Sequence, residues 1–307
     1  MHMTESSAVR LSALSSEVAG LVSRCGPSVV AIRVRGAHSL SGITWRPGYV
    51  VTAAETLDDQ PSTLRVISGT GTEHTAKLIG QDPSTDVALL AVDGLSTSGP
   101  QLADPTTLRA GEFVLALGRS PEHGPIVTFG TVAVAGASWD SQLGGRIDRF
   151  IRVGAAMTPA AEGGAVFDLS GQLLGMAVFG PRRALLAIPV PTIARIAEQL
   201  VAKGRISRGY LGLAMQPVQL PEALQRAAGT RIGMLVSNVD PDSSAALGGI
   251  LLGDVIVAWN SEPVRDYRQV QQLLGPESIG SSVALVAVRA GALTTLRLTV
   301  GERPHSG

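Results

Sequence analysis

The sequence predicts a mostly β protein built from two successive domains. Short runs of β-branched and aliphatic residues follow one another between turns, as in Val29–Val34 and Leu173–Val178. Of the 307 residues, 36 are glycine, 18 are proline and only 16% are charged, which favours short strands and turns over long helices. A chain of this length can form two domains of about 100–200 residues, each with its own core.

The charge balance and the cysteine content exclude several function classes. Lys+Arg and Asp+Glu both total 25, so no net field attracts nucleic acid or an anionic membrane surface. Cys25 is the single cysteine, which excludes an intrachain disulfide and a thiolate metal cluster. We therefore expect no cofactor and no redox chemistry.

The N-terminal sequence favours a chain that stays in the cytoplasm. Its first thirty residues lack a basic region followed by about 7–15 apolar residues, and no stretch approaches the ~18–20 apolar residues of a membrane span. A periplasmic or extracytoplasmic location stays open if an N-terminal signal or anchor was removed, because Met1-His2-Met3 has the form of a cloning remnant.

Residues 1–26 are expected to form a helical segment. Apolar residues recur at helical spacing, and the Cys25-Gly26-Pro27 sequence ends the pattern. These apolar residues are Leu11, Leu14, Val18, Leu21 and Val22. Their stripe needs a partner, which is either the chain's own β domain or a neighbouring subunit.

Residues 27–204 are expected to form the first β domain, a barrel or a sandwich. Its clearest strands are Val29–Val34, Tyr49–Thr52, Val87–Val92, Phe113–Leu117 and Leu173–Val178. A helix is expected from Thr192 to Lys203, and Gly204 would end it. The apolar face of this helix comprises Ile193, Ile196, Ala197, Leu200 and Val201.

Residues 205–303 are expected to form a second, smaller domain. Strands are indicated at Tyr210–Leu213, Gly253–Trp259, Val283–Val288 and Leu293–Val300, and together they predict a small barrel. Pro241–Leu247 has the pattern of a short capped helix. A second helix follows Asp266, which forms a capping-box pattern with Gln269. Gly275-Pro276 closes that helix.

A series of motifs in this order resembles the HtrA (Deg) family of trypsin-like serine proteases. The motifs are Pro27-Ser28-Val29-Val30, Thr85–Leu90, Leu108–Glu112, Ala161-Glu162-Gly163-Gly164-Ala165 and Ala187-Ile188-Pro189. The sequence from Arg208 onward is similar to the PDZ domain that follows the protease domain in that family. The resemblance covers nearly the whole chain past residue 26. It implies a chymotrypsin-like double β-barrel followed by a small PDZ β-barrel/α domain.

The resemblance also implies that the catalytic triad is degenerate. Only the aspartate position is retained, as Asp86, whereas Glu55 stands at the histidine position and Glu162 at the serine position. Acyl transfer needs a hydroxyl or thiol nucleophile and a base that takes its proton. Ala160 and Ala161 also replace the glycine and asparagine expected before the serine. We therefore do not expect serine-type proteolysis from this chain.

The substitutions would place three carboxylates in one cleft, where two of them ~4 Å apart repel by ~4 kcal/mol at an effective dielectric of 20. Three arrangements would relieve this repulsion: a proton shared between the carboxylates, an arginine that pairs with them, or a divalent metal ion held by Glu55, Asp86 and Glu162. In the remaining alternative, the glutamates swing to solvent and never meet. Paired carboxylates also occur in glycosidases, but three Trp and three Tyr are few for a sugar-binding cleft.

Other residues offer no replacement for the nucleophile or the base. Thr158, Ser170 and Cys25 lie off the matching position. His38, His74 and His123 fall in expected loops, with no spacing that ties them to a nucleophile.

The C-terminal domain retains the pattern that peptide binding requires. In PDZ domains an extended peptide adds to a sheet edge, and backbone N–H groups of a loop hold its terminal carboxylate. The matching loop comprises Tyr210, Leu211, Gly212 and Leu213, with Arg208 as an electrostatic aid, and the opposite wall comprises Val270, Leu273 and Leu274. The ligand would end in an apolar residue. In the alternative, Leu211 and Leu213 fill the core and the groove is closed.

The predicted function is that of a non-catalytic pseudoprotease, acting as a peptide-binding scaffold, regulator or chaperone-like factor in protein quality control. Its partners would be protein C-termini or unfolded polypeptide, with no nucleic acid and no membrane span. The resemblance implies a homo-oligomer, commonly a trimer. The alternative is an active hydrolase, either a serine endopeptidase by descent or an enzyme with an unrecognised carboxylate or metal centre.

Overall fold

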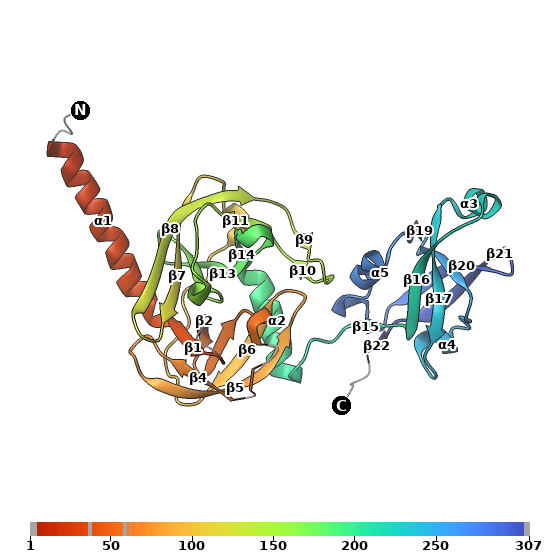
Figure 1. The fold of residues 1–307 in the computed structure, drawn as a ribbon, viewed down its shortest axis with the longest axis horizontal. Coiled ribbons are helices and arrows are strands. Elements are labelled where there is room, and N and C mark those ends of the chain that lie inside the picture. Colours follow the sequence, from red (N-terminus) through yellow and green to blue (C-terminus); the bar gives the residue numbers. More distant parts are fainter. Residues whose placement is uncertain (1–4, 36–38, 58–59, 62, 304–307) are drawn as a thin grey trace. The chain divides into compact units, whose positions relative to one another are not determined.

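The computed structural model describes residues 5–35, 39–57, 60–61 and 63–303. It comprises two compact units, Met1–Trp139 with Ile147–Ile206, and Asp140–Arg146 with Ser207–Gly307 (Figure 1). The domain limits predicted from the sequence, 27–204 and 205–303, stay predictions. Within the described part of the chain, no helix combines the length and the apolar character needed to cross a membrane.

Helix α1, Glu5–Cys25, opens the first unit and touches the β strands only through its last turns (Figure 1). Leu21 and Cys25 are buried in the main core, and Val18 and Val22 pack against it. Leu14, one turn before Val18, is 49% exposed, and the side chain of Leu11 lies outside the described part of the helix. The helix predicted from the apolar spacing is present, and its C-terminal end packs on its own unit.

The first barrel is closed in the order β1-β2-β3-β6-β5-β4. Its strands are β1 (Val29–Arg33), β2 (Ser39–Arg46), β3 (Tyr49–Thr52), β4 (Thr63–Ile67), β5 (Glu73–Asp82) and β6 (Val87–Val92). Short 3-10 helices precede β1 (η1, Gly26–Ser28) and follow β3 (η2, Glu55–Leu57). Successive side chains of a strand point alternately into the barrel interior and toward the second barrel. Nearly all apolar side chains of β1 and β6 are therefore buried.

The second barrel is closed in the order β11-β14-β13-β12-β7-β8. Its strands are β7 (Phe113–Ser120), β8 (Gly124–Ala135), β11 (Ile151–Val153), β12 (Ala165–Asp168), β13 (Leu173–Phe179) and β14 (Leu185–Pro189). A two-stranded sheet pairs β9 (Trp139–Asp140) with β10 (Arg146–Ile147). The 3-10 helices of this part are η3 (Pro105–Thr107), η4 (Pro159–Ala161) and η5 (Pro181–Arg183).

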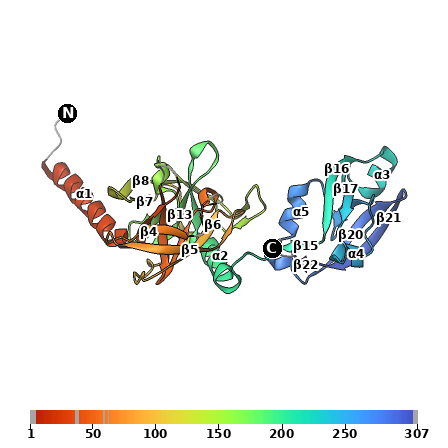
Figure 2. The same cartoon turned by 60° about the horizontal axis from the view of Figure 1, so that its bottom comes forward.

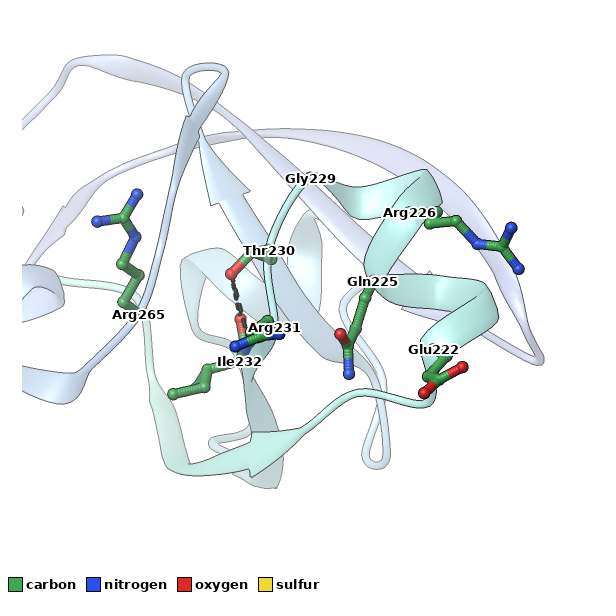
Figure 3. A pocket seen from close by; sticks show the side chains of 8 residues that line it. All are labelled: Glu222, Gln225, Arg226, Gly229, Thr230, Arg231, Ile232 and Arg265. Atoms are coloured by element: carbon green, nitrogen blue, oxygen red, sulfur yellow. Dashed lines mark hydrogen bonds between the residues drawn. The ribbon is translucent and has the colours of Figure 1, made fainter.

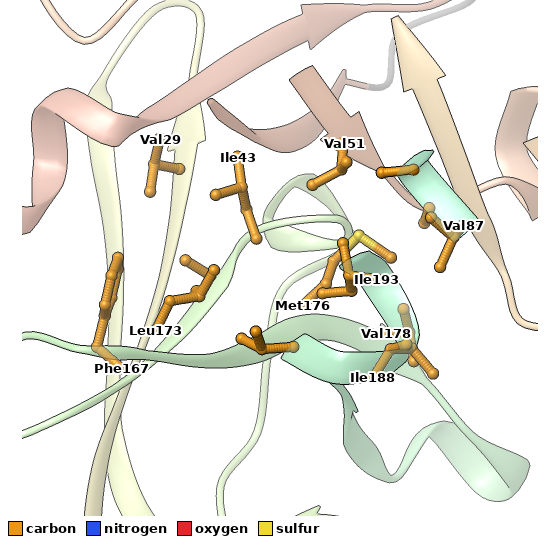
Figure 4. Packing of buried hydrophobic residues seen from close by; sticks show 14 of the residues in the cluster. Val29, Ile43, Val51, Val87, Phe167, Leu173, Met176, Val178, Ile188 and Ile193 are labelled. Carbon is orange, nitrogen blue, oxygen red and sulfur yellow. The ribbon is translucent and has the colours of Figure 1, made fainter. Parts of the chain in front are cut away.

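One hydrophobic core joins the two barrels (Figure 4). Val29, Ile43 and Val51 of the first barrel meet Phe167 and Met176 of the second. All five are fully buried. Because the barrels share this core, residues at their junction are held in place by both.

Helix α2, Val190–Lys203, packs against strands of both barrels, β5 and β6 in one and β13 and β14 in the other. It begins two residues before the predicted start. It ends as predicted at Gly204, which has φ 69° and whose N–H donates to the Leu200 carbonyl oxygen (2.8 Å). Val201, placed on the apolar face by the sequence pattern, is 38% exposed instead. Val201 lies at the margin of the buried apolar stripe, which includes Ile193, Ile196 and Leu200.

The second unit contains a six-stranded sheet with the order β16-β17-β18-β20-β21, and β19 pairs with β18. Its strands are β16 (Leu213–Gln219), β17 (Ile232–Val239), β18 (Val255–Trp259), β19 (Glu262–Pro263), β20 (Ser282–Arg289) and β21 (Ala292–Thr299), while β15 (Gly209–Tyr210) pairs with β22 (Gly301–Glu302). The sequence predicted a small barrel here. Among the described strands this sheet is open, with β16 at one edge.

Helices α3 (Glu222–Ala228), α4 (Ser244–Leu247) and α5 (Tyr267–Leu273) and the 3-10 helix η6 (Pro276–Ser278) complete the unit. Ser243 and Asp266 cap α4 and α5 by accepting from the Ala246 and Gln269 N–H groups. Helix α5 packs beside the edge strand β16 (Figure 2).

Candidate functional sites

Glu55 and Asp86 are brought together by the pairing of β3 with β6. Thr52 at the end of β3 lies opposite Ala88 near the start of β6. Glu55, which follows β3, and Asp86, which precedes β6, therefore lie at the same end of the barrel. Asp86 adopts φ 57°, and its Oδ1 accepts from the backbone N–H groups of Ala54 (2.8 Å) and Glu55 (2.9 Å). The aspartate therefore caps the turn that carries Glu55.

Glu162 lies at the junction of the barrels, between η4 and β12. The Ser41 N–H of β2 donates to the Glu162 carbonyl oxygen (2.8 Å). The next residue, Gly163, has φ 78°, and a Cβ there would lie 2.3 Å from the Ser41 carbonyl oxygen. The tight turn of the Glu162-Gly163-Gly164 sequence therefore packs directly against the first barrel, and only glycine fits at its centre.

The three carboxylates influence one another, and their environments differ. Glu55 is exposed, whereas Asp86 and Glu162 are half-buried. Burial raises the pKa of Asp86 to about 6, with smaller contributions from the charges of Glu162 and Glu55, against the two N–H donors. Burial also raises the pKa of Glu162, and the charge of Glu55 adds to this effect.

Groups from both barrels favour the charged form of Glu162. The Phe179 N–H of β13 and the Thr56 hydroxyl of η2 each hydrogen-bond to this residue and lower its pKa, as does the nearby Arg183. Glu162 thus turns into the junction and binds protein groups there, while Glu55 faces solvent. Among the described residues, no group of three acidic, histidine or cysteine side chains lies close enough together to hold a metal ion. The metal hypothesis for Glu55, Asp86 and Glu162 stays a prediction.

The backbone around Glu162 is already hydrogen-bonded. Its N–H, which at the matching position of a serine protease would help to hold an oxyanion, donates to the Pro159 carbonyl oxygen (3.1 Å) within the η4 turn. The Ser41 hydroxyl also hydrogen-bonds to the η4 turn before Glu162. It is fully buried, donates to the Ala160 carbonyl oxygen (2.7 Å) and accepts from the Arg119 N–H (2.8 Å). No sequence pattern had marked Ser41, because both bonds join segments far apart in the chain.

The other candidate nucleophiles and bases have separate structural roles. Cys25 is buried in the core, and burial raises the pKa of its thiol. Thr158 and Ser170 are exposed.

Of the histidines, His38 lies outside the described residues, and His74 hydrogen-bonds through Nδ1 to the Asp93 carbonyl oxygen (2.9 Å). His123 lies 3.3 Å from the Ser120 hydroxyl, which accepts from two backbone N–H groups of the same exposed turn.

The loop from Tyr210 to Leu213 presents two backbone donors. The Leu211 and Gly212 carbonyl oxygens accept from the Ala245 and Asp240 N–H groups (2.9 and 2.8 Å). Their own N–H groups donate to no partner within the part of the chain that the structure describes. The Tyr210 hydroxyl binds the Asp240 carboxylate, which raises the pKa of the tyrosine. This loop therefore has the free donors that carboxylate capture requires.

The residues expected to form the peptide groove differ in exposure. Leu211 and Val270 are buried in the core of the second unit, whereas Leu213, Leu273 and Leu274 are partly buried and pack against it. Leu211 thus fills the core, as the closed-groove alternative had it, although its backbone N–H stays unpaired among the described residues. The Arg208 carbonyl oxygen accepts from the Arg303 N–H (3.0 Å). The binding role of these residues stays a prediction.

Comparison with known proteins agrees with this architecture. A trypsin-like peptidase domain matches residues 40–176, and a PDZ domain matches residues 235–289. The structure of the HtrA-type protease AlgW with a decapeptide superposes with a TM-score of 0.71 at 27% identity, covering 94% of this chain and 99% of AlgW. The serine endoprotease of Yersinia pestis superposes with a TM-score of 0.69 at 26% identity, covering 92% and 97% of the two chains. The chain thus has the HtrA-type architecture, a trypsin-like peptidase domain followed by a PDZ domain.

Curated relatives of this chain are named probable periplasmic serine endoproteases, DegP-like. The Brucella suis relative is 34% identical over 266 residues, which are 84% of this chain and 51% of the relative. The Pseudomonas savastanoi relative is 34% identical over 283 residues, which are 90% and 58% of the two chains. The chain thus spans about half the length of the curated relatives it matches.

The expectation of a cytoplasmic location is wrong. The curated relatives of this chain are named as periplasmic proteins. The expectation rested on the first thirty residues, but the N-terminal residues of one sequence do not report a signal that has been removed.

Proposed function

We propose that this chain is a non-catalytic protein that captures the C-termini of other polypeptides through its PDZ domain. The observation that carries the proposal is the chemistry of the cleft. By the family resemblance, Glu162, a half-buried carboxylate, takes the position of the attacking hydroxyl, and Glu55, an exposed carboxylate, takes that of the base. A carboxylate at the attacking position cannot form the acyl-enzyme that a serine hydroxyl forms.

The backbone geometry supports the same conclusion. The Glu162 N–H is taken by the Pro159 carbonyl oxygen, so one donor needed for an oxyanion is occupied. In the PDZ domain, by contrast, the Leu211 and Gly212 N–H groups are free of partners among the described residues. AlgW, a structural relative, has been solved with a decapeptide and with a tripeptide. We extend peptide binding to this chain on the basis of its own loop.

A scaffold or chaperone-like role in protein quality control follows, in an extracytoplasmic compartment, since the relatives are named periplasmic. We also propose a homo-oligomer, with a trimer as the form that the family resemblance implies. The stacked rings of Phe113 and Phe129, with centroids 5.2 Å apart, leave an apolar surface on β7 and β8, where the two side chains are 52% and 40% exposed. Light scattering of the purified chain measures the assembly.

Activity labelling tests the non-catalytic proposal. The unmodified chain is treated with a fluorophosphonate probe and assayed on unfolded casein, beside the double variant Glu55→His/Glu162→Ser and an active HtrA protease as positive control. We expect no label and no hydrolysis from the unmodified chain. Label on a residue of the cleft, or casein hydrolysis abolished by Glu162→Ala, would establish the alternative, an active hydrolase like its named relatives.

A further inference from the structure

We propose that the PDZ domain carries a second subsite, built around Arg231 and Arg265, for acidic residues that lie upstream of the ligand's C-terminus. This inference rests on the proposed capture of C-termini, and it adds a ligand class to it.

The direction of a bound ligand follows from the position of the loop. The free N–H groups of Leu211 and Gly212 lie immediately before β16, an edge strand with α5 beside it. A peptide whose carboxylate is held there and which adds to that edge must run antiparallel to β16. Its upstream residues therefore pass the end of β16 at Gln219.

The length of β16 sets which ligand residues reach its end. A strand rises about 3.3 Å per residue, so the six steps from Leu213 to Gln219 span roughly 20 Å. Ligand residues about four to seven positions before the C-terminus would lie there. Pro217 has no N–H to offer an added strand. Side-chain contacts must therefore hold this part of the ligand more than backbone pairing does.

Two adjoining hollows open at this end of the sheet. A cavity of 290 Å³ is lined by Pro217, Val218 and Gln219 of β16 together with Arg231 and Ile232. A larger cavity of 780 Å³ shares Arg231 and Ile232 and extends to α3 and to Arg265, the residue before the cap of α5. Figure 3 shows Arg231 between Arg265 on one side and Gln225 of α3 on the other. The hollow thus continues from the strand edge toward the start of α5.

The lining of the larger cavity is positively charged. It includes Arg226, Arg231 and Arg265 and a single acidic residue, Glu222. Figure 3 shows the Arg226 side chain pointing away from Arg231 and Arg265. No ion pair with a carboxylate engages any of these arginines among the residues that the structure describes. Guanidinium groups bind carboxylates through charge-assisted hydrogen bonds. The chemistry of this hollow therefore selects glutamate or aspartate over neutral or basic residues.

Peptide binding to the full-length chain tests the subsite. Three fluorescent ten-residue peptides share an apolar four-residue end with a free carboxylate, and carry glutamate, glutamine or lysine at the four positions before it. Since exposed charge pairs contribute little each, we expect the glutamate peptide to bind about fivefold more tightly than the glutamine peptide at low salt. The lysine peptide should bind most weakly. The glutamate preference should shrink as salt rises to about 0.5 M.

Variants assign the preference to the two arginines. Arg231→Gln/Arg265→Gln should reduce binding of the glutamate peptide to the level of the glutamine peptide and leave the latter unchanged. Arg297→Gln, which removes an exposed arginine on the opposite edge strand β21, is the matched control and should keep the preference.

The outcomes separate this subsite from the C-terminal capture on which it rests. Equal affinity of the unmodified chain for the glutamate and glutamine peptides, or a preference that persists in the double variant, overturns the acidic subsite alone. Failure of every free-carboxylate peptide to bind overturns the proposed capture, and the subsite with it. Peptides with an amidated C-terminus should bind weakly in all cases if capture is correct.

Discussion

Asp86 has a structural role that does not depend on proteolysis. Its left-handed backbone conformation, φ 57°, is one that aspartate tolerates better than most residues. Its Oδ1 accepts the N–H groups of Ala54 and Glu55, which would otherwise lack a partner in the turn. The carboxylate is nevertheless poorly solvated, because burial raises its pKa to about 6 from 3.8. The hydrogen bonds accepted by Oδ1 stabilise the fold, whereas the buried negative charge destabilises it.

The first prediction concerns this charge. Since the folded pKa of Asp86 exceeds that of the unfolded chain, the folded state binds the proton more tightly, and the free energy of unfolding falls as pH rises from about 4 to about 6. The raised pKa of Glu162 acts in the same direction. Asp86→Asn keeps the acceptor and removes the charge, so it should stabilise the protein by about 1–3 kcal/mol at pH 7.5 and by little at pH 4.5.

Urea unfolding at the two pH values measures this effect. Asp86→Ala is the matched control, because it removes the acceptor as well as the charge and should be about 1 kcal/mol less stable than Asp86→Asn through the uncapped N–H groups. An Asp86→Asn variant that is less stable than the unmodified chain at pH 7.5 would show that the ionised carboxylate stabilises the fold.

At the residue scale, the charges of Glu55, Asp86 and Glu162 influence one another. Motif order predicted these residues as the triad positions, an assignment that stays a prediction. Motif order could not locate the partners of Glu162. Thr56 and Phe179 reach this residue from different barrels, and Ser41 meets Ala160 across 119 positions of sequence. Such bonds depend on the packing of two barrels and leave no local pattern.

The loop before β16 is the element on which ligand capture depends. Gly212 has φ 79°, and a Cβ there would lie 2.1 Å from the Ser243 Cβ at the cap of α4. Ser243 in turn follows Asp240, whose N–H donates to the Gly212 carbonyl oxygen. The glycine allows the loop to lie against α4 while its N–H groups stay free.

The second prediction is that Gly212→Ala disrupts this element. The alanine methyl group must displace the cap of α4, so we expect the second unit to lose about 2 kcal/mol of stability and peptide affinity to fall at least about tenfold. Thermal unfolding and fluorescence anisotropy with the glutamine peptide measure the two effects. Gly280→Ala is the control, since Gly280 has φ 80° with no atom within 4 Å of an added Cβ. Equal losses in the two variants would mean that backbone strain alone, and not the contact with Ser243, controls the loop.

At the element scale, apolar runs located β3 and β6 at their observed bounds, because buried strands of a barrel are apolar on both faces. The 12-residue strand β8 was not singled out. Its residues alternate between exposed and half-buried positions, and glycine, proline and threonine interrupt the apolar pattern. Strand β16 carries Pro217 and few buried residues for the same reason, since it is an edge.

In the first unit, Arg119 of β7 ties the second barrel to the first. It is buried, with its Nε donating to the Val29 carbonyl oxygen (2.7 Å) and its Nη2 to that of Gly26 (3.0 Å). Burial lowers the pKa of the guanidinium. Its backbone N–H also bonds Ser41, which holds the turn before Glu162. Arg119 thus links β1, β2 and, through Ser41, the turn before Glu162.

The third prediction is that Arg119→Met destabilises the first unit by about 2–4 kcal/mol, because two buried carbonyl oxygens lose their donors. Urea unfolding monitored by circular dichroism measures the loss. Arg33→Met is the control, since Arg33 is exposed and its ion pair with Glu122 is solvent-accessible, so its change should stay within about 0.5 kcal/mol. Comparable stability of the two variants would contradict the proposed role of Arg119 between the barrels.

The sequence by itself determined the mostly β class and the order of the two modules, and it predicted acidic residues at the triad positions. These features depend on local periodicity, turn residues and motif order, which can be read within each segment without knowing how the segments pack. Only the tertiary structure decided that Glu162 turns inward while Glu55 faces solvent, that the Glu162 N–H is already bonded, and that Arg231 and Arg265 line one hollow. Each of these depends on segments remote in the chain meeting at one place, so that burial and hydrogen-bond partners are set by packing and not by neighbours in sequence.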